Sequence, residues 1–572
     1  MKTLISLKFL VFIIFMFIIT GAYSQYDFEW SKSFGGDSSE ASPFISCDND
    51  GNIFMVAGFV GTATFGSFTF TSYSNFCNGV ILKINPDGNI EWVKQIQSFG
   101  DVQINNIIFD NNDNFFISGF YLNKTIFDTD TIESIGWYNF FIAKYNNDGM
   151  LQWVKHGGWS TTSISKIAID YEDNILFSVI GRSDTLLYEN DTLIAYNTID
   201  TNACLFLFKI NSNGNLIWAK EPIKIETVPS PCGNICVITC ISTDSLNNIY
   251  LAGTFHGCNI IIGTDTFLGK NYYLTFIAKF DSSGNFVWAK QSNGIQSQPR
   301  DIISDKSGNT YLIGRFIGTL IFDTDSVVTT PTGDALFIGK FNTNGNVQWL
   351  KKANGFLPSR MTKDENENFY ITGFSHGGAQ FDSITVIPDY IISIHSFAIL
   401  VKYNSNGNAE FAKYIKGVEG YDLMGNPINC DNYGTGVCIG NNQNLFFSGT
   451  YRYKVVIGSD TLINHDTTNV VGDTDIFITK LSFTTGITNF YAKDDIIVYP
   501  NPATDKITIG NLNKASKYII SDVLGNTIYK ANIDNPDAPE IRINLSGLNP
   551  GVYIIQIFDE KNNIYYKKII KQ

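Results

Sequence analysis

The chain has 572 residues, more than one hydrophobic core usually serves, so several domains or a repeat array are expected. Hydrophobic residues make up 44% of it and aromatic residues 14%, against 16% charged residues, which excludes a disordered chain and suits buried β-sheet. The formal net charge of −14 argues against the basic surface that nucleic-acid binding requires, so no nucleic-acid partner is expected.

Residues 1–24 have the pattern of a secretory signal peptide. Lys2 and Lys8 precede the apolar run from Phe9 to Ile19, and small residues lead to an expected cleavage after Ser24. The alternative is a retained membrane anchor, but this run is shorter than the roughly 20 apolar residues that span a bilayer. No later run is long enough either, so we expect no transmembrane segment in the mature chain.

A block of two parts recurs along the chain. The first part is a strand, an Asn/Asp/Gly turn and a strand that ends in Gly and an aromatic residue, and the second is another strand, turn and strand. The first parts begin 59 to 76 residues apart at seven positions: Asp48, Asp110, Asp170, Asp244, Asp305, Asp364 and Gly440. Short alternating strands with periodic Gly and aromatic residues are typical of radial β-repeats.

The seventh copy lacks its last strand, because the chain leaves the pattern after Asp475–Lys480. The missing Trp-x-Lys strand stands alone at the other end, in Tyr26–Lys32. We therefore expect residues 25–484 to form a closed seven-bladed β-propeller whose N-terminal strand completes the last blade. A linear β-solenoid, the alternative, would leave open sheet edges and the split repeat unexplained.

Three motifs carry a resemblance to a known repeat family. They are Gly308–Gly314 (GNTYLIG), Phe337–Lys340 (FIGK) and Gly345–Trp349 (GNVQW). In these the chain resembles the SBBP family of bacterial β-propeller repeats. The resemblance implies a propeller fold and leaves the ligand open, because propellers host many unrelated functions.

A linker, residues 485–496, separates the repeats from a different pattern in residues 497–572. Short alternating strands with Pro and Gly turns predict a small immunoglobulin-like β-sandwich there. The whole chain is thus expected to be all-β. A plain sandwich domain used for adhesion is the alternative interpretation of this segment.

This segment closely resembles the type A C-terminal sorting domain of the type IX secretion system of the Bacteroidota. The matching residues are Pro500, Asn501, Pro502, Gly551, Tyr553, Lys567 and Lys568. The resemblance implies that the type IX machinery is a partner and carries the folded propeller across the outer membrane of a Gram-negative bacterium. It also implies removal of the module, with the cargo released or attached to lipopolysaccharide at the surface.

Nine cysteines in an exported chain permit disulfides. Cys232 and Cys240, and likewise Cys430 and Cys438, are eight residues apart and lie in insertions at the same point of the repeat. Local disulfides within each pair are the preferred interpretation, and buried free thiols are the alternative. The spacing fits no usual zinc pattern and the chain has only five His, so no metal is predicted.

Two motifs resemble a catalytic and a metal-binding site, but the sequence around each motif does not fit such a site. Gly373–Gly377 (GFSHG) matches the Gly-x-Ser-x-Gly pattern of hydrolases, but the sister copies show that it is a strand end, and no helix is expected after it. The Asp-rich turns lack the ligand loop of a calcium site, and hairpins need such residues anyway. No catalytic residue and no cofactor are therefore predicted.

Two insertions, at 221–239 and 417–436, break the repeat between one blade and the next. Long loops on a rigid scaffold often bind ligands. The candidate ligand-binding residues are Glu419, Tyr421, Asp422, Asp431 and Tyr433. We therefore predict a secreted or cell-surface binding or adhesion protein without enzymatic activity, for an extracellular glycan or protein ligand; the alternative is an extracellular glycan hydrolase or lyase.

Overall fold

The chain folds as β-strands wherever the computed structural model describes it, and no α-helix occurs in that part, which confirms the all-β prediction. The described residues are 25–41, 43–73, 75–158, 162–181, 185–189, 191–194, 204–227, 235–330, 333–387, 395–418, 430–440, 443–465, 473–484, 497–510, 515–522, 527–533, 535, 538, 540–559 and 564–572. The predicted signal peptide lies outside them. The chain divides into one unit of Phe28–Ser482 and a second of Met1–Asp27 with Phe483–Gln572.

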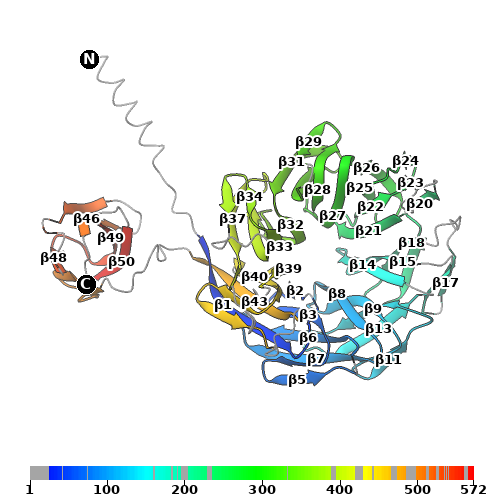
Figure 1. Ribbon diagram of the computed structural model, residues 1–572, viewed down its shortest axis with the longest axis horizontal. Helices are drawn as coiled ribbons and strands as arrows, with labels where there is room; N and C mark the ends of the chain where they lie inside the picture. Colours follow the sequence, from blue (N-terminus) through cyan, green and yellow to red (C-terminus); the bar gives the residue numbers. More distant parts are fainter. Residues whose placement is uncertain are drawn as a thin grey trace, which may run out of the picture. The chain divides into compact units, whose positions relative to one another are not determined.

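The larger unit is a set of antiparallel sheets around a central axis (Figure 1). Each sheet has a core of four strands, and the order of these strands runs from the innermost strand outward. Three sheets are β2 (Phe44–Cys47), β3 (Ile53–Phe59), β6 (Asn78–Ile84), β7 (Ile90–Ser98); β8 (Val102–Phe109), β9 (Phe115–Tyr121), β12 (Asn139–Tyr145), β13 (Leu151–Gly157); and β14 (Thr162–Ile169), β15 (Ile175–Gly181), β18 (Cys204–Ile210), β19 (Leu216–Lys220).

The sheets that follow repeat this order. They are β21 (Ile235–Thr243), β22 (Ile249–His256), β25 (Leu274–Phe280), β26 (Phe286–Gln291); β27 (Asn293–Ser304), β28 (Thr310–Phe322), β30 (Ala335–Phe341), β31 (Val347–Asn354); β32 (Leu357–Lys363), β33 (Phe369–His376), β36 (Ser396–Tyr403), β37 (Ala409–Tyr414); and β39 (Asn432–Ile439), β40 (Leu445–Tyr451), β43 (Asp475–Thr484), β1 (Gln25–Gly36). The sheet of β39 thus takes its outer strand, β1, from the other end of the chain.

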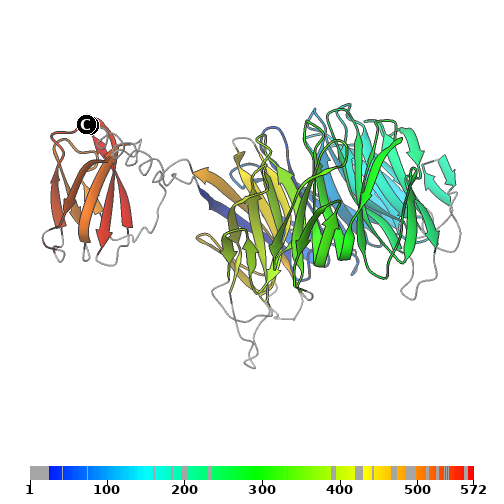
Figure 2. The ribbon, with the colours of Figure 1, turned by 90° about the horizontal axis from the view of Figure 1, so that it is seen from above.

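The innermost strands contact one another in the order β2, β8, β14, β21, β27, β32 and β39, and β39 contacts β2 again. They run roughly along the axis, as the side view in Figure 2 shows. Strands such as β3 and β6 are buried along their whole length. The hydrophobic cores lie between neighbouring sheets: one joins Phe54 and Ile81 of the β2 sheet to Phe115 and Phe141 of the β8 sheet.

Short hairpins extend the sheets outward. Each hairpin follows the second strand of one repeat. Four of the six pair with the outer strand of the preceding sheet, which covers that edge, and the hairpins of the fourth and seventh repeats pair with a short strand in a separate sheet. The strands are β4 (Thr62–Phe65), β5 (Phe68–Thr71), β10 (Lys124–Phe127), β11 (Asp130–Glu133), β16 (Thr185–Tyr188), β17 (Asp191–Ile194), β23 (Cys258–Ile262), β24 (Asp265–Phe267), β34 (Ala379–Phe381), β35 (Ile384–Val386), β41 (Lys454–Ile457) and β42 (Asp460–Ile463). β20 (Lys224–Thr227) and β38 (Lys416–Gly417) pair with two of them, and β29 (Asp325–Val328) pairs with the far end of β28.

A tryptophan of one sheet packs on a turn glycine of the next. Gly345 has a φ of +80°, and a Cβ there would lie 2.7 Å from the indole of Trp288, while the Trp288 Nε1–H donates to the Thr343 carbonyl at 3.0 Å. Only glycine fits this conformation and this close approach. The pairs that make the contact are Trp30–Gly88, Trp92–Gly149, Trp153–Gly214, Trp218–Gly284, Trp288–Gly345 and Trp349–Gly407.

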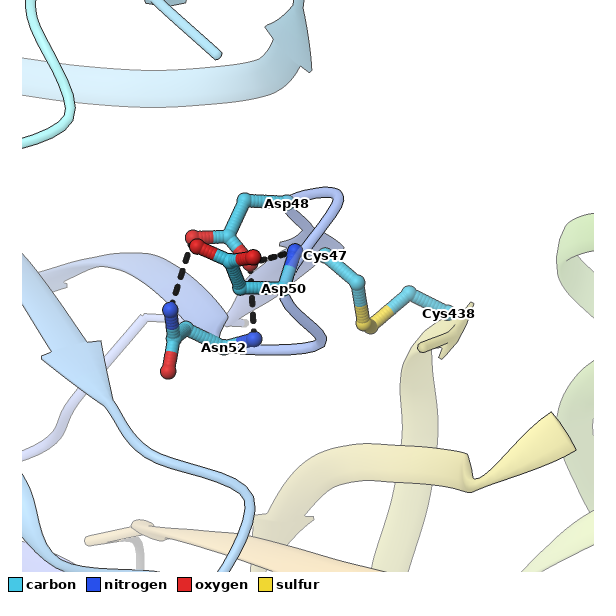
Figure 3. Close-up of a disulfide and its surroundings, with 5 residues drawn as sticks. All are labelled: Cys47, Asp48, Asp50, Asn52 and Cys438. Atoms are coloured by element: carbon cyan, nitrogen blue, oxygen red, sulfur yellow. Dashed lines mark hydrogen bonds between the residues drawn. A yellow bond between two sulfur atoms is a disulfide. The ribbon is translucent and has the colours of Figure 1, made fainter. Parts of the chain in front are cut away.

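The Asp of each first-part turn fixes that turn by hydrogen bonds. Asp48 Oδ1 accepts the backbone N–H groups of Asp50 and Asn52, at 3.0 and 2.8 Å (Figure 3). Elsewhere the same Asp also pairs with a buried lysine: Lys209 Nζ lies 2.8 Å from Asp170 Oδ2. Both side chains are buried, so this lysine neutralises the turn carboxylate inside the fold.

The C-terminal part of the second unit contains two antiparallel sheets. One is β44 (Ile497–Tyr499), β45 (Lys506–Gly510) and β48 (Glu540–Asn544); the other is β47 (Thr527–Asn532), β46 (Ala515–Asp522), β49 (Gly551–Asp559) and β50 (Ile564–Lys571). Their core includes Ile509, Ile543, Ile520, Ile555 and Ile569. Residues from both sheets therefore share one small hydrophobic core.

Candidate functional site

The innermost strands carry β-bulges at the same level of the larger unit. On β27, Pro299 pairs with Gly314 and Asp301 with Ile313, so Arg300 between them has no partner across the ladder. A bulge redirects the side chain that it leaves unpaired. At this level the unpaired residues of six innermost strands are all polar: Asn105, Ser165, Lys166, Thr239, Arg300, Ser359 and Thr435.

All of these bulge residues line one cavity of about 500 Å³. Its wall also has apolar side chains, among them Phe44, Leu357, Pro358 and Phe374. The lining includes four cations, Lys166, Arg300, Arg315 and Arg360, and no carboxylate among the residues that the structure describes. We call these four residues the cationic group. In a chain with a net charge of −14, this gathering of one sign of charge favours an anionic ligand.

The members of the cationic group differ in their partners. Lys166 forms an ion pair with Asp301, and Arg315 Nε donates to Gln298 Oε1 at 2.8 Å. Arg360 Nη2 donates to the carbonyl of Asn105 at 3.0 Å, and its guanidinium lies 4.5 Å from the centre of the Phe44 ring. These contacts hold three of the cations in place.

Arg300 forms no ion pair with the described part of the chain. Its side chain is open to the solvent of the cavity although protein atoms surround it. This enclosure, and then the neighbouring charge of Arg315, lower the pKa of the Arg300 guanidinium from its ordinary value. Arginine stays charged in proteins, so Arg300 offers a positive charge to a ligand, and the charge of Asp334 also acts on it.

The predicted loop residues are placed only in part. Glu419, Tyr421 and Asp422 lie outside the described residues. Asp431 is buried and its Oδ1 accepts the Ser396 backbone N–H at 2.5 Å. Tyr433 is half-buried, and its hydroxyl donates to Asp431 Oδ2 at 3.3 Å.

Tyr433 adjoins the cavity wall through its ring, whose centre lies 4.9 Å from that of Phe374 in an edge-on contact. Burial is the main cause that raises the pKa of the Tyr433 hydroxyl above its ordinary value. Asp431 and Tyr433 therefore support the wall, and neither lines the cavity itself.

The cysteine pairing differs from the prediction. Cys438 is bonded to Cys47, not to Cys430, with 6.0 Å between the two Cα atoms and 391 residues between them in sequence (Figure 3). Cys438 lies on β39 and Cys47 on β2, and these innermost strands are neighbours, whereas Cys430 precedes β39 on the same chain segment. Cys240 is a buried thiol, and its predicted partner Cys232 lies outside the described residues.

The predicted sorting-motif residues meet in the smaller unit. Asn501 Nδ2 donates to the Lys568 carbonyl at 2.6 Å, and Asn501 Oδ1 accepts the Ile570 N–H at 2.8 Å. Pro500 and Pro502 flank this asparagine, and Lys567 and Lys568 belong to β50. On the neighbouring strand β49, Gly551 pairs with Lys571, and the Tyr553 hydroxyl donates to the Asn549 carbonyl at 2.8 Å.

No set of three or more His, Cys, Asp or Glu in the described part of the chain is arranged to hold a metal ion. Ser375, the serine of the Gly-x-Ser-x-Gly match, is buried and accepts the Gly378 N–H. The neighbouring His376 contacts Ser396 instead, with 2.9 Å between its Nδ1 and the Ser396 hydroxyl. This motif therefore does not form a nucleophile with its base.

Sequence reasoning missed the cationic group. One signal was available for Arg300, because in six of the seven copies the residue five positions before the turn Asp or Gly is a bulge residue, as with Arg300 before Asp305 and Thr435 before Gly440. Aligning the repeats at this position would have shown a polar ring. Arg315 has no such signal, because it lies on a second strand and enters the cavity beside Gln298.

Comparison with known proteins identifies the C-terminal segment. Residues 497–572 match the family described as the secretion system C-terminal sorting domain. The segment is a sorting domain. It indicates export by the type IX secretion system to the cell surface or the extracellular space. Among the described residues, none forms a helix long and apolar enough to cross a membrane.

Two curated relatives match parts of the chain. An uncharacterised WD repeat-containing protein of Acanthamoeba polyphaga mimivirus is 23% identical over 425 residues, which cover 61% of this chain and 30% of the relative. An endo-acting ulvan lyase of Formosa agariphila is 44% identical over 84 residues, which cover 14% of this chain and 16% of the lyase. The chain therefore spans less than a third of the length of either relative.

Solved structures with a similar chain path include propellers. The Dos1 propeller shares 11% identity with a TM-score of 0.36, over 80% of this chain and 96% of that one. An ulvan lyase shares 9% identity with a TM-score of 0.38, over 76% of this chain and 96% of that one. The SBBP repeat type and the signal peptide stay predictions.

The comparisons contradict the prediction that the chain is not an enzyme. The ulvan lyase of Formosa agariphila, an enzyme by its name, is among the sequence relatives, although the match covers only 14% of this chain. The prediction rested on the lack of a catalytic set in the repeat pattern, and residues that converge only after folding leave no such pattern.

Proposed function

We propose that this protein is exported by the type IX secretion system and acts outside the cell on an acidic polysaccharide, whose acid groups bind in the cavity lined by the cationic group. One observation carries the proposal: four cations and no described carboxylate line a cavity of about 500 Å³. Arginine presents a planar set of donors that matches carboxylate and sulfate groups.

The scaffold that we propose is a closed seven-bladed propeller with residues 25–484 as its extent. Its support is the cyclic order of contacts among the innermost strands, the pairing of β1 beside β43, and the Cys47–Cys438 bond between β2 and β39. A closed scaffold holds the cavity wall rigid, so the cationic group is preorganised for its ligand.

A polysaccharide fits the cavity better than a small inorganic anion. The apolar wall of Phe44, Leu357, Pro358 and Phe374 gives surface for sugar rings beside the charged groups. The sorting domain delivers the protein to the outside, where polymers are met, and one relative is by name an ulvan lyase. The proposal covers a protein that binds the glycan and a protein that also cleaves it.

The described ends of the two insertions lie at this proposed site. The first insertion runs into β21 and ends at the cavity residue Thr239, and the second runs into β39 and includes the cavity residue Thr435. We therefore keep Glu419, Tyr421 and Asp422 as proposed ligand contacts, with Asp431 and Tyr433 behind the wall.

The test uses the exported protein purified from the culture or the cell surface. Its binding to polygalacturonate, to a sulfated galactan and to a neutral glucan is measured by calorimetry at low and high salt. Arg300→Gln should weaken binding to the acidic polymers by about tenfold or more, because it removes one charge-assisted contact. Lys306→Gln, at an exposed turn away from the cavity, is the matched control for lost charge and should bind as the wild type does.

The same mixtures are assayed for new reducing ends and unsaturated products, which shows directly whether the glycan is cleaved. Equal affinity for acidic and neutral polymers, or equal effects of Arg300→Gln and Lys306→Gln, would contradict a charge-selective site in the cavity. Salt should weaken the binding of acidic polymers, since screening reduces their attraction to the cationic group.

A further inference from the structure

Aromatic side chains gather outside the cavity, where the β2 and β8 sheets of the larger unit adjoin. They come from the loop between β5 and β6, the connection between β7 and β8, strand β9, and the loop between β11 and β12. Trp137 has 65% of its surface open to solvent, which is unusual for the largest apolar side chain, and Tyr73 and Phe76 are exposed as well. We call this set the aromatic surface: Tyr73, Phe76, Phe99, Phe120, Trp137 and Tyr138.

Two ring contacts hold part of this surface in place. The ring centres of Tyr73 and Phe99 lie 4.7 Å apart. Those of Phe120 and Tyr138 lie 5.3 Å apart, in an edge-on contact. Lys124 Nζ lies 5.8 Å from the centre of the Phe99 ring and places a positive charge beside the rings. Because each contact holds a loop side chain against a neighbouring segment, these rings are ordered before a ligand binds, which lowers the entropy cost of binding.

Asp101 joins the two loops of the aromatic surface. Its Oδ1 accepts the N–H of Cys77, the residue after Phe76, at 3.0 Å. Its Oδ2 accepts the hydroxyl of Tyr138, the residue after Trp137, at 2.8 Å. Both loops are therefore held by one carboxylate. Since both oxygens of this carboxylate are engaged within the protein, the exposed part of the surface is formed by the rings.

The aromatic surface reaches the level of the cavity through Phe120. Phe120 stands at the repeat position that the cavity residues Arg315 and Phe374 occupy in their own copies, directly after the glycine of the first part. In all three copies the partner across the ladder is the residue seven positions before the turn Asp. For Phe120 this partner is Gln103, two residues from the cavity residue Asn105. Equivalent positions of a radial repeat lie at one level, so a chain bound in the cavity can continue over Phe120.

We propose that the aromatic surface is a second subsite for the same glycan, on which sugar rings stack beyond the part of the chain that lies in the cavity. This inference rests on the proposed function and extends it. The C–H groups on one face of a sugar ring form an apolar patch that packs on an exposed aromatic ring, while the hydroxyl groups at the edge stay in water. A polysaccharide is long enough to occupy both subsites, whereas a small anion occupies only the cavity.

Trp137→Ala tests the second subsite. The native exported protein is titrated with trigalacturonate and with polygalacturonate. The variant should bind polygalacturonate about threefold to tenfold more weakly, the effect of one lost ring contact. Its affinity for trigalacturonate should equal that of the wild type, because the cationic group holds the short ligand. Leu246→Ala is the matched control, since it removes an exposed apolar side chain in the turn between β21 and β22 and should bind both ligands normally.

Fluorescence measures the contact directly. The exposed indole of Trp137 is open to quenching by acrylamide, and bound polygalacturonate should shield it. The loss of quenching on adding polygalacturonate should therefore be larger in the wild type than in Trp137→Ala. Trigalacturonate should cause less shielding than the polymer in the wild type. Equal shielding in the two proteins would contradict stacking on Trp137.

The failure of this inference and that of the proposed function give different results. Binding of polygalacturonate that Arg300→Gln lowers and Trp137→Ala leaves unchanged would overturn the second subsite and leave the proposed function standing. Absence of binding to any acidic polymer would overturn both. A wild-type dimer that Trp137→Ala dissociates, with the affinity for polygalacturonate unchanged, would assign the aromatic surface to a second copy of the chain and also overturn the second subsite.

Discussion

At the scale of single residues, the repeat is held by contacts that each blade makes with the next. The turn glycines support the indole rings of the preceding sheet, and the turn Asp carboxylates are paired inside the fold. The sequence shows both marks because they recur at a fixed spacing. It could not show the cationic group, since Arg300, Arg315 and Arg360 come from different positions in the repeat and meet only when the sheets surround the axis.

Gly345→Ala tests the glycine–indole contact. The new Cβ would lie 2.7 Å from the Trp288 ring at a φ of +80°, so we expect a loss of about 1–3 kcal/mol in the free energy of unfolding, measured in urea. Gly377→Ala is the matched control, because Gly377 has a φ of +84° with nothing within 4 Å. The control should lose less free energy of unfolding, only the part that comes from placing alanine at a positive φ. Equal losses in the two variants would contradict a role for the indole.

The loop residues illustrate the limit of interpreting residues one at a time. Asp431 and Tyr433 looked like ligand contacts because they are polar and lie in an insertion. In the fold, Asp431 accepts hydrogen bonds from the Ser396 N–H and from the Tyr433 hydroxyl, so these polar atoms are engaged within the protein. A polar type in a loop indicates a binding role only when its partners are known, and those partners come from other strands.

At the scale of elements, the order of strands and turns could be predicted from short sequence patterns. The pairing of strands and cysteines far apart in the sequence could not. Strand ends could be predicted from the Asp, Asn and Gly turns, which act within a few residues. Four of the outward hairpins pair with the preceding sheet, and Cys47 is bonded to Cys438 at a sequence separation of 391, which spacing alone cannot predict. Connectivity of cysteines depends on which strands the fold makes neighbours.

The Cys47–Cys438 bond should stabilise the larger unit. Replacing both cysteines by serine is expected to lower the free energy of unfolding by about 2–5 kcal/mol, because the bond restricts a very long loop of the unfolded chain. Thermal unfolding is measured with and without a reductant. The reductant should lower the wild-type Tm to that of the double variant and leave the variant unchanged. A wild-type Tm that ignores the reductant would contradict this.

A second contact between the ends of the larger unit involves a buried carboxyl. Glu40 follows β1, and its backbone N–H donates to the Thr474 carbonyl at 2.9 Å, beside Asp475 at the start of β43. Burial first, and then the charge of Asp475, raise the pKa of Glu40 from 4.5 to about 10. Glu40 is therefore protonated in the folded chain at neutral pH and ionised in the unfolded chain.

This shift has a defined sign for stability. Between about pH 4.5 and about pH 10 the unfolded chain binds fewer protons at Glu40, so folding is disfavoured progressively as pH rises. Glu40→Gln should remove that loss, with stability raised by at least about 1 kcal/mol near neutral pH and little change in acid. Urea unfolding over a pH series measures it. The control is Asp37→Asn, which removes an exposed carboxyl of the same segment and should not give this pH-dependent gain in stability. If the difference in free energy of unfolding between Glu40→Gln and the wild type did not change with pH, the raised pKa of Glu40 would be contradicted.

At the scale of the whole molecule, the all-β class and the sorting segment could be predicted because their marks are local and ordered. Whether the chain is an enzyme could not be predicted in this way, since catalytic groups come together only through the fold, and the prediction that it is not an enzyme was wrong. Two parts of the molecule are therefore tested separately: a C-terminal segment that directs export and a propeller that carries the cavity.

Asn501→Ala tests the sorting segment. The variant loses the bonds to the Lys568 carbonyl and the Ile570 N–H, so the two-proline segment should be held less firmly on β50, by the backbone bonds of Ala503 alone among those described, at a cost of about 1–2 kcal/mol to the domain. Export should fall, with the protein retained inside the cell envelope on fractionation. Asn549→Ala is the control, because only the backbone carbonyl of Asn549 accepts the Tyr553 hydroxyl. Normal export of Asn501→Ala would show that this contact does not matter for sorting.

The central claim is that the cavity lined by Lys166, Arg300, Arg315 and Arg360 binds an acidic glycan. A crystal structure of the native exported protein with a short oligogalacturonate tests it most directly. We predict electron density for a sugar residue inside the cavity, with its carboxylate within hydrogen-bond distance of the Arg300 and Arg315 guanidinium groups. A glycan bound elsewhere on the surface while the cavity holds only water would contradict the claim.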